Sequence, residues 1–131
     1  MPNSHFVNDI REFHKTFGLT LDDSDPSIET MLLRFELISE EYAEVGKAFA
    51  TSLVDKSPEV KRELAKELID LLYVTVGALE AFGMPTDVLW NRVHRSNMSK
   101  LAEDGSVIYS ETGKALKGPN YQSPNFEDII N

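Results

Sequence analysis

The chain has 131 residues, 41% of them hydrophobic and 27% charged, and it carries a net charge of −9. This length suits one domain, 1–131, with a core of its own. The acidic balance argues against nucleic-acid binding, which depends on lysines and arginines that displace counterions from phosphates. Because cysteine is absent, disulfides, thiolate catalysis and cysteine-based zinc sites are excluded.

No targeting segment or membrane anchor is visible. The N-terminus lacks the basic start and the apolar run of a signal peptide. The longest apolar stretch, residues 71–79, is too short to span a bilayer. We therefore expect a cytoplasmic protein that does not contact membranes.

Four helices are predicted within residues 1–100. The first covers roughly residues 4–17 and carries one apolar stripe, formed by Phe6, Ile10, Phe13 and Phe17. After a turn-rich linker, Asp25 as the N-cap and Pro26 as the first helical residue predict the start of a long helix that ends near residue 52.

A second long helix follows after a short link. Ser57 and Pro58 repeat the start signal, and Gly83 marks the end of this third helix. The fourth helix follows Pro85 and ends near Lys100. Two long helices joined by a short link are predicted to form an antiparallel hairpin.

The helical period is lost over residues 101–131. Turn signals such as Asp104-Gly105 and Gly118-Pro119 recur in this segment. We expect a non-helical C-terminal tail, either an ordered loop or a flexible arm. A short strand over 106–110 is compatible with the sequence.

Carboxylates interrupt the apolar stripes of both long helices. Glu41 and Glu44 lie on the stripe of the first long helix, with Glu40 beside them, and Glu67 and Asp70 lie on the stripe of the second. Residues three or four apart share one face of a helix. If the hairpin packs by these stripes, the two pairs of carboxylates point towards each other.

Such a group of carboxylates needs a counter-charge. Two unit charges about 4 Å apart repel by roughly 4 kcal/mol at an effective dielectric near 20. Either several carboxyl groups are protonated or a cation lies among them, unless the glutamates form a solvated helix face. Mg²⁺ commonly binds through a few carboxylates together with substrate phosphates, so the pattern suggests Mg²⁺ and a phosphate ester.

Other acidic residues and other metal sites fit less well. The chain matches neither the Glu-x-x-His motif of di-iron bundles nor an EF-hand loop. The glutamates without a same-face partner are interpreted as surface residues: Glu12, Glu29, Glu36, Glu59 and Glu80.

The acidic pattern resembles the signature of a known superfamily. The motif Glu40-Glu41-x-x-Glu44, followed after a spacer by Glu67-x-x-Asp70, is similar to that of the MazG-like, all-α nucleoside triphosphate pyrophosphohydrolases. These include dimeric dUTPases and phosphoribosyl-ATP pyrophosphohydrolases. The segments ELIDLLYVTVGAL, VHRSNMSK and GKALKGPNY resemble the phosphoribosyl-ATP pyrophosphohydrolase-like branch, and the resemblance covers about residues 30–121.

The resemblance implies an all-α fold. This MazG-like helical bundle would have the long antiparallel helix hairpin, two shorter helices and the non-helical tail. Oligomerisation would complete a four-helix core, so the resemblance also implies a homodimer or a dimer of dimers.

The resemblance further implies roles for single residues. Glu41, Glu44, Glu67 and Asp70 would bind Mg²⁺, for which Mn²⁺ can substitute. Glu40 would bind a further ion, or orient and deprotonate the attacking water. The implied reaction converts a (d)NTP, with deoxynucleotides expected, into a (d)NMP and pyrophosphate.

Candidate substrate contacts lie towards the end of the chain. By resemblance, Asn97 and Lys100 would contact the sugar or the phosphates. His94 lies one helical turn before Asn97, and Lys114 and Lys117 lie in the tail.

The nucleobase is not identified by the sequence. Aromatic and histidine side chains that could contact it, or could equally belong to the core, are Phe13, His14, Phe17, Tyr73 and Tyr121. Two alternatives stay open beside a general (d)NTP pyrophosphohydrolase. One is a narrower enzyme, dUTPase-like or specific for dGTP or dATP, and the other is a non-enzymatic helical module with an acidic face.

Overall fold

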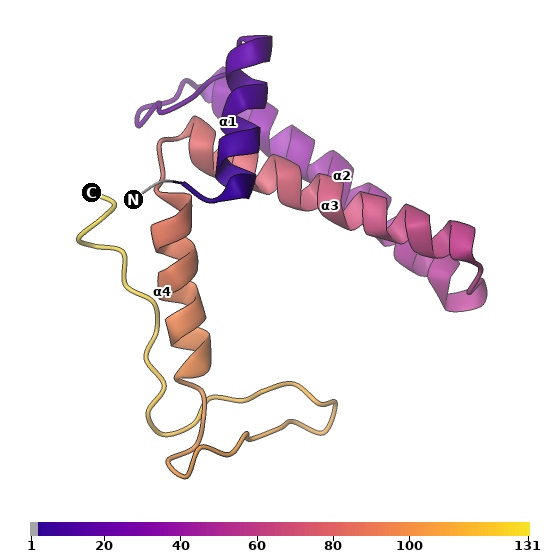
Figure 1. The fold of residues 1–131 in the computed structure, drawn as a ribbon, viewed down its shortest axis with the longest axis vertical. Coiled ribbons are helices and arrows are strands. Elements are labelled where there is room, and N and C mark those ends of the chain that lie inside the picture. Colours follow the sequence, from indigo (N-terminus) through magenta and orange to yellow (C-terminus); the bar gives the residue numbers. More distant parts are fainter. Residues whose placement is uncertain (1–2) are drawn as a thin grey trace. The chain divides into compact units, whose positions relative to one another are not determined.

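The computed structural model describes residues 3–131 and is all-helical, as predicted. The helices are α1 (His5–Phe17), α2 (Ile28–Val54), α3 (Pro58–Ala81) and α4 (Thr86–Met98) (Figure 1). Over the described residues no β-strand forms, and the segment compatible with a strand makes only an isolated bridge between Tyr109 and Ala115. Within the same residues, no single helix is long and apolar enough to cross a membrane.

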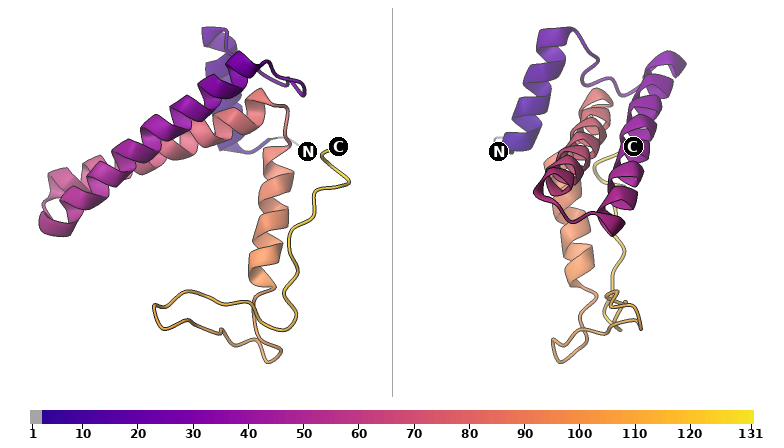
Figure 2. Two further views of the ribbon diagram at one scale, coloured as in Figure 1. Left: turned by 180° about the vertical axis from the view of Figure 1, so that it is seen from behind. Right: turned by 90° about the vertical axis from the view of Figure 1, so that its right-hand side faces the viewer.

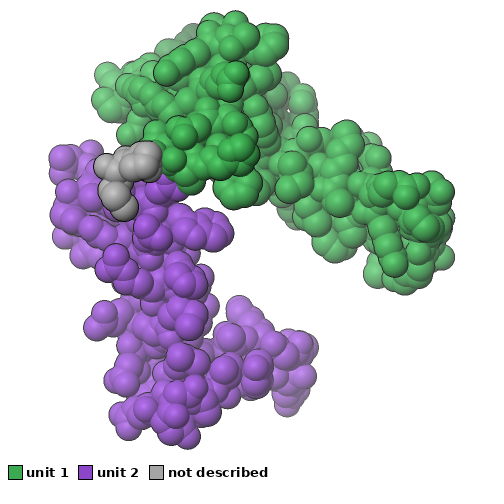
Figure 3. All heavy atoms as spheres, viewed as in Figure 1, with its two compact units in different colours: residues 1–84 green, residues 85–131 purple. Residues whose placement is uncertain are grey.

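The chain divides into two compact units between α3 and α4. One comprises Met1–Met84 and the other Pro85–Asn131 (Figure 3). The first unit contains all five carboxylates predicted to bind metal, and the second contains α4 and the tail. Each unit is described below by itself.

Serine side chains begin the first three helices. Ser57 Oγ accepts a hydrogen bond from the Val60 N–H (3.5 Å), which confirms the predicted start of α3. The predicted start of α2 at Asp25 is wrong. Ser27 is the N-cap, because its Oγ accepts from the Thr30 N–H at 3.2 Å.

Glycines mark the ends of α1 and α3. Gly18 (φ 68°) and Gly83 (φ 69°) both adopt the left-handed conformation, which costs glycine little because it lacks a Cβ. The predicted ends of these two helices, near residue 17 and at Gly83, are both confirmed.

The helices α2 and α3 form the predicted antiparallel hairpin. They lie side by side along their length in both views of Figure 2 and are joined by residues 55–57. Glu41 of α2 lies near Asp70 of α3, and nearer the start of α2, Arg34 lies beside the position of Gly77. Residue numbers therefore fall along one helix as they rise along the other.

Helix α1 packs against α3 through a small apolar core. Val7 and Ile10 are buried with Val76 of α3, and Tyr73 packs against them. The predicted stripe on α1 is therefore confirmed at Ile10 and wrong at its phenylalanine ends. Phe6 and Phe17 are 63% and 65% exposed, because the buried face is shifted by about one residue relative to the phenylalanines.

An ion-pair group fastens α1 to the end of α3. Arg11 Nη1 donates to Glu80 Oε1 and to Asp22 Oδ1, both at 2.9 Å, and Nη2 donates to Asp22 Oδ2 at 2.6 Å. Glu80 is only 5% exposed, so its interpretation as a surface residue is wrong. The guanidinium supplies the counter-charge that allows this carboxylate to be buried.

In the second unit the tail returns to the end of α4 as an ordered loop. The Gly118 N–H donates to the Lys100 carbonyl at 2.9 Å, and the Gln122 N–H donates to Ser99 Oγ at 3.0 Å. Arg92 of α4 also pairs with the Asp128 carboxylate through two hydrogen bonds of 2.9 Å. The non-helical tail is thus held to α4 at several points.

Candidate active site

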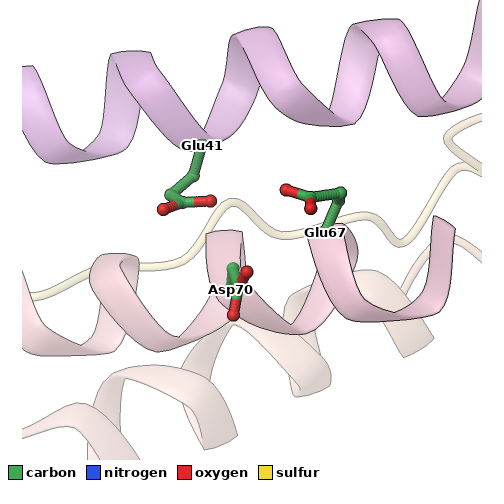
Figure 4. A group of neighbouring side chains, drawn as sticks. All are labelled: Glu41, Glu67 and Asp70. Atoms are coloured by element: carbon green, nitrogen blue, oxygen red, sulfur yellow. The ribbon is translucent and has the colours of Figure 1, made fainter. Parts of the chain in front are cut away.

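Three carboxylates converge between the long helices of the first unit. Glu41 extends from α2 towards Glu67 and Asp70 of α3 (Figure 4). One oxygen from each of the three residues lies within 4.8 Å of the others. Glu67 and Asp70 share a face because they are three residues apart, and the antiparallel pairing places Glu41 opposite them.

The three carboxylates are partly shielded from water. Glu67 is 4% exposed, and Glu41 and Asp70 are half-buried. The pKa of Glu41 is raised, first by burial and then by the negative charges of Asp70 and Glu67. The negative charges of the three carboxylates therefore repel one another.

A lysine offsets part of this charge. Lys66 Nζ lies 3.1 Å from Glu67 Oε1 and 2.8 Å from Asp70 Oδ2. Both carboxylates raise the pKa of the lysine by accepting its hydrogen bonds. One ammonium group cannot balance three carboxylates, and the Lys66 side chain is 62% exposed, so the cluster keeps an excess of negative charge.

The cluster fits a hard divalent cation. Mg²⁺ and Ca²⁺ take oxygen ligands, and Mg²⁺ often binds through one or two carboxylates together with substrate phosphates. Three carboxylate oxygens close together, incompletely neutralised and partly withdrawn from water, provide such a donor set. Glu41, Glu67 and Asp70 could therefore hold the ion.

The other two predicted ligands lie outside the three-carboxylate cluster. Glu44 is exposed and pairs with Lys47 at 3.4 Å on its own helix. Glu40 is also exposed, although its charge adds to the effects that raise the pKa of Glu41. Participation of Glu40 and Glu44 in metal binding stays a prediction.

One further carboxylate was missed in the sequence. The pKa of Glu63 is raised, first by a hydrogen bond with Glu67 and then by burial and nearby negative charge. Glu63 also lines a pocket between α2 and α3 together with Glu44. The available signal was spacing, because Glu63 lies one helical turn before Glu67 and so shares its face.

Three of the predicted substrate contacts lie together in the second unit. Lys117 Nζ is 4.8 Å from the centre of the Tyr121 ring. The pKa of Tyr121 is lowered by hydrogen bonds with Ser96 and Ser123, and also by the charges of Lys117 and Lys100. Lys100, Lys117 and Tyr121 thus form a polar group where the tail meets α4.

The remaining contacts of the second unit are more exposed. His94 and Asn97 lie on exposed positions of α4. Lys114 lies in a turn, where its N–H donates to Ser110 Oγ at 3.0 Å. Their contact with a substrate stays a prediction, as it does for the group at Tyr121.

The aromatic candidates of the first unit belong partly to its packing. Tyr73 meets the Phe13 ring edge-on, with 5.7 Å between centroids, and Phe13 packs on Phe17 at 4.7 Å. His14 is 2% exposed, and its Nδ1 lies 2.8 Å from the Thr20 carbonyl oxygen. A role in base binding stays a prediction for all four.

The fold and the cluster together define a class: all-α proteins in which two antiparallel helices present carboxylates suited to a divalent ion. A family model for phosphoribosyl-ATP pyrophosphohydrolase matches residues 10–97. The chain belongs to this family, and the match includes every carboxylate of the cluster. No curated protein matches the chain.

Family membership carries a general function. The family implies a pyrophosphohydrolase that acts on a nucleoside triphosphate, and its members typically depend on a divalent metal ion. The resemblance drawn from the acidic motif is therefore confirmed at this level.

Proposed function

We propose that this protein is a Mg²⁺-dependent nucleoside triphosphate pyrophosphohydrolase that converts a (d)NTP into a (d)NMP and pyrophosphate, with deoxynucleotides preferred. The observation that carries this proposal is the convergence of Glu41, Glu67 and Asp70 within the segment matched by the family. A cluster that retains negative charge is suited to a cation that also binds phosphates.

Each residue of the site would have its own role in the reaction. Glu41, Glu67 and Asp70 would hold Mg²⁺, or Mn²⁺ in its place. When bound, the ion would polarise the phosphate and neutralise charge on the leaving pyrophosphate. Glu40, exposed beside Glu41 on the same helix, would accept a proton from the attacking water, with Glu63 as the alternative base. Lys66, which contacts Glu67 and Asp70, would contact a substrate phosphate when the ion binds these carboxylates.

A substrate panel tests this proposal. Purified protein is incubated with Mg²⁺ and each ribo- or deoxynucleoside triphosphate, and the products are separated as mono- and diphosphates. We expect monophosphate and pyrophosphate in equal amounts, loss of turnover with a chelator and recovery when Mg²⁺ is restored. In ¹⁸O-labelled water one product should carry one labelled oxygen.

The same panel separates the alternatives. Hydrolysis restricted to dUTP, dGTP or dATP would favour the narrower enzyme. A nucleoside diphosphate and orthophosphate as the main products would contradict cleavage between the α- and β-phosphates. No metal-dependent release of pyrophosphate from any nucleotide would favour a non-enzymatic helical module.

We also propose that the first unit assembles as a homodimer or a dimer of dimers. Large apolar side chains are exposed along α2, among them Leu32 (62%), Phe35 (69%) and Tyr42 (71%). Extended apolar patches are uncommon on monomeric proteins and often mark interfaces. Light scattering after size-exclusion chromatography should therefore give two or four times the chain mass of 14.8 kDa.

A further inference from the structure

One buried arginine in the first unit lacks a partner. Arg34 of α2 is 5% exposed, and its Nε is buried without a hydrogen-bond partner. No ion pair among residues 3–131 includes it. Burial alone lowers the pKa of its guanidinium, with no neighbouring carboxylate to oppose the shift.

The other arginines show that this is unusual for the chain. Arg11 is bound by two carboxylates, Arg62 and Arg92 each pair with one, and Arg95 is exposed. An unpaired charge withdrawn from water costs several kcal/mol. A guanidinium buried in this way is therefore expected to find its acceptor in the working state of the protein.

Gly77 of α3 and His14 of α1 lie close to the guanidinium of Arg34. A Cβ at Gly77 of α3 would lie 3.5 Å from Arg34 Nη1 and 3.2 Å from His14 Nε2. The Nδ1 of His14 is engaged with the Thr20 carbonyl at 2.8 Å, so a neutral His14 donates there and presents Nε2 as an acceptor. Arg34 Nη1 and His14 Nε2 thus both lie beside the bare Cα of Gly77.

Arg34 also lies in register with the candidate active site. It precedes Glu41 by seven residues, and Gly77 follows Asp70 by seven, so both lie two turns from the carboxylates on the faces that meet. At 1.5 Å of rise per residue this is about 10 Å along the helices. In a nucleotide the sugar separates the base from the phosphates. If the phosphates lie at the carboxylates, the base therefore lies towards one end of the hairpin, and Arg34 lies in one of these two directions.

We propose that Arg34 is the base-recognition residue of the enzyme, and that it selects nucleobases with two adjacent acceptors on one edge, above all guanine. This inference rests on the proposed function. An arginine fork donates two parallel hydrogen bonds, and O6 and N7 of guanine are the acceptors that it commonly binds in nucleic acids. Cytosine offers a similar pair in N3 and O2, whereas adenine and thymine place a donor beside or between their acceptors.

The test compares bases in the wild-type protein and in Arg34→Lys. Lysine keeps the positive charge but loses the planar fork. We expect the wild-type protein to prefer dGTP, then dCTP, over dATP and dTTP. In Arg34→Lys, kcat/KM for dGTP should fall about 10- to 100-fold, while that for dATP and dTTP changes less than about threefold. Arg62→Lys, an exposed arginine of α3, is the matched control and should keep the wild-type preference.

A second variant guards against misfolding at a buried site. Gly77→Ala adds one methyl group against Arg34 and His14 and favours the helix. We expect it to reduce kcat/KM for dGTP selectively, with helical content unchanged in circular dichroism. An equal loss for all four nucleotides in both variants, or a wild-type preference for dATP or dTTP, would overturn the role of Arg34 in base selection.

A binding measurement keeps this inference separate from the proposed reaction. Calorimetric titration with dGMP, dCMP, dAMP and dTMP requires no turnover. Tighter binding of dGMP that is lost in Arg34→Lys would support base recognition by Arg34. If the same protein hydrolyses no triphosphate, only the proposed reaction is rejected. If an active enzyme binds the four monophosphates equally, Arg34 does not select the base, and the proposed hydrolysis is unaffected by this result.

Discussion

Two groups of carboxylates, each with one member outside α3, differ in how their negative charge is balanced. Near the end of the helix, Glu80 and Asp22 share the fork of Arg11, with hydrogen bonds of 2.6–2.9 Å. In its middle, Glu67 and Asp70 face a third carboxylate and are offset only by an exposed lysine. The first group is neutralised by the fold, whereas the second is left acidic by it.

This difference distinguishes charged groups that stabilise the fold from charged groups that are available to bind a ligand. A guanidinium held in place by two carboxylates makes a strong, directional contact, and here it joins α1 to α3. An exposed ammonium such as that of Lys66 contributes little to stability, because water screens the pair. A group neutralised only in that way remains available to a cation from solution.

The largest effect should come from removing one charge of the acidic group. We expect Asp70→Asn or Glu41→Gln to reduce kcat/KM for the best triphosphate by about 10³-fold or more, equivalent to at least about 4 kcal/mol. The reason is the loss of a ligand to the ion. Glu29→Gln, an exposed glutamate of α2, should retain activity. Near wild-type turnover in both site variants would remove the carboxylates from the metal site.

Substitution in the group formed by Arg11, Glu80 and Asp22 should change the stability of the protein and not its turnover. Arg11→Met leaves Glu80 buried without its guanidinium and is expected to lower the free energy of unfolding by about 3 kcal/mol. Arg62→Met, which breaks an exposed pair with Glu59, should cost less than about 0.5 kcal/mol. Urea denaturation followed by circular dichroism measures both, and equal losses would refute the distinction.

Mg²⁺ should stabilise the acidic group and leave the neutralised one unaffected. At 100 times its dissociation constant, an ion that binds only the folded state adds about 2.7 kcal/mol. We expect a corresponding rise in the Tm of the wild-type protein and of Arg11→Met. Asp70→Asn should show a much smaller rise at the same concentration. A rise of the same size in all three proteins would place the ion elsewhere.

The smallest effect concerns the protein without metal. Because the folded protein raises the pKa of Glu41 above its usual 4.5, ionisation of Glu41 destabilises the fold as the pH rises through the raised value. With a chelator at pH 7, Glu41→Gln should therefore increase Tm, by less than any of the effects above. The gain should shrink to nothing as the pH falls below 4.5, where the carboxyl group is protonated in both states. A gain that is constant with pH would not arise from this ionisation.

Short-range rules account for what the sequence predicted well. Ser57, Gly18 and Gly83 mark helix ends through contacts within a few residues of each. Glu67 and Asp70 meet on one face through the helical repeat alone. Each of these features can be read from one segment of the chain without knowledge of its neighbours.

Apart from the N-cap of α2, which is Ser27 and not Asp25, the features that the sequence did not reveal concern contacts between helices. Periodicity does not fix how α2 is aligned against α3, so it could not show that Glu44 lies exposed beside Lys47, outside the three-carboxylate cluster. A role of Glu44 in metal binding stays a prediction. Glu80 and Arg34 are buried even though charged residues are usually exposed. The groups that explain their burial, or surround them, lie on other helices far along the chain.

The backbone contact at Gly118 has a consequence for the order of folding. A Cβ at this position would lie 2.6 Å from the Leu101 carbonyl oxygen and 2.7 Å from that of Lys100. The contact closes a loop of the intervening residues onto the chain just after α4, so it can form only once that end has taken shape. Closure carries an entropic cost that the tail must recover from a few hydrogen bonds, and the tail should therefore be the last part of its unit to fold and the first to open. Gly118→Ala would bring out this step without shortening the chain, because one methyl group is enough to prevent the loop from closing.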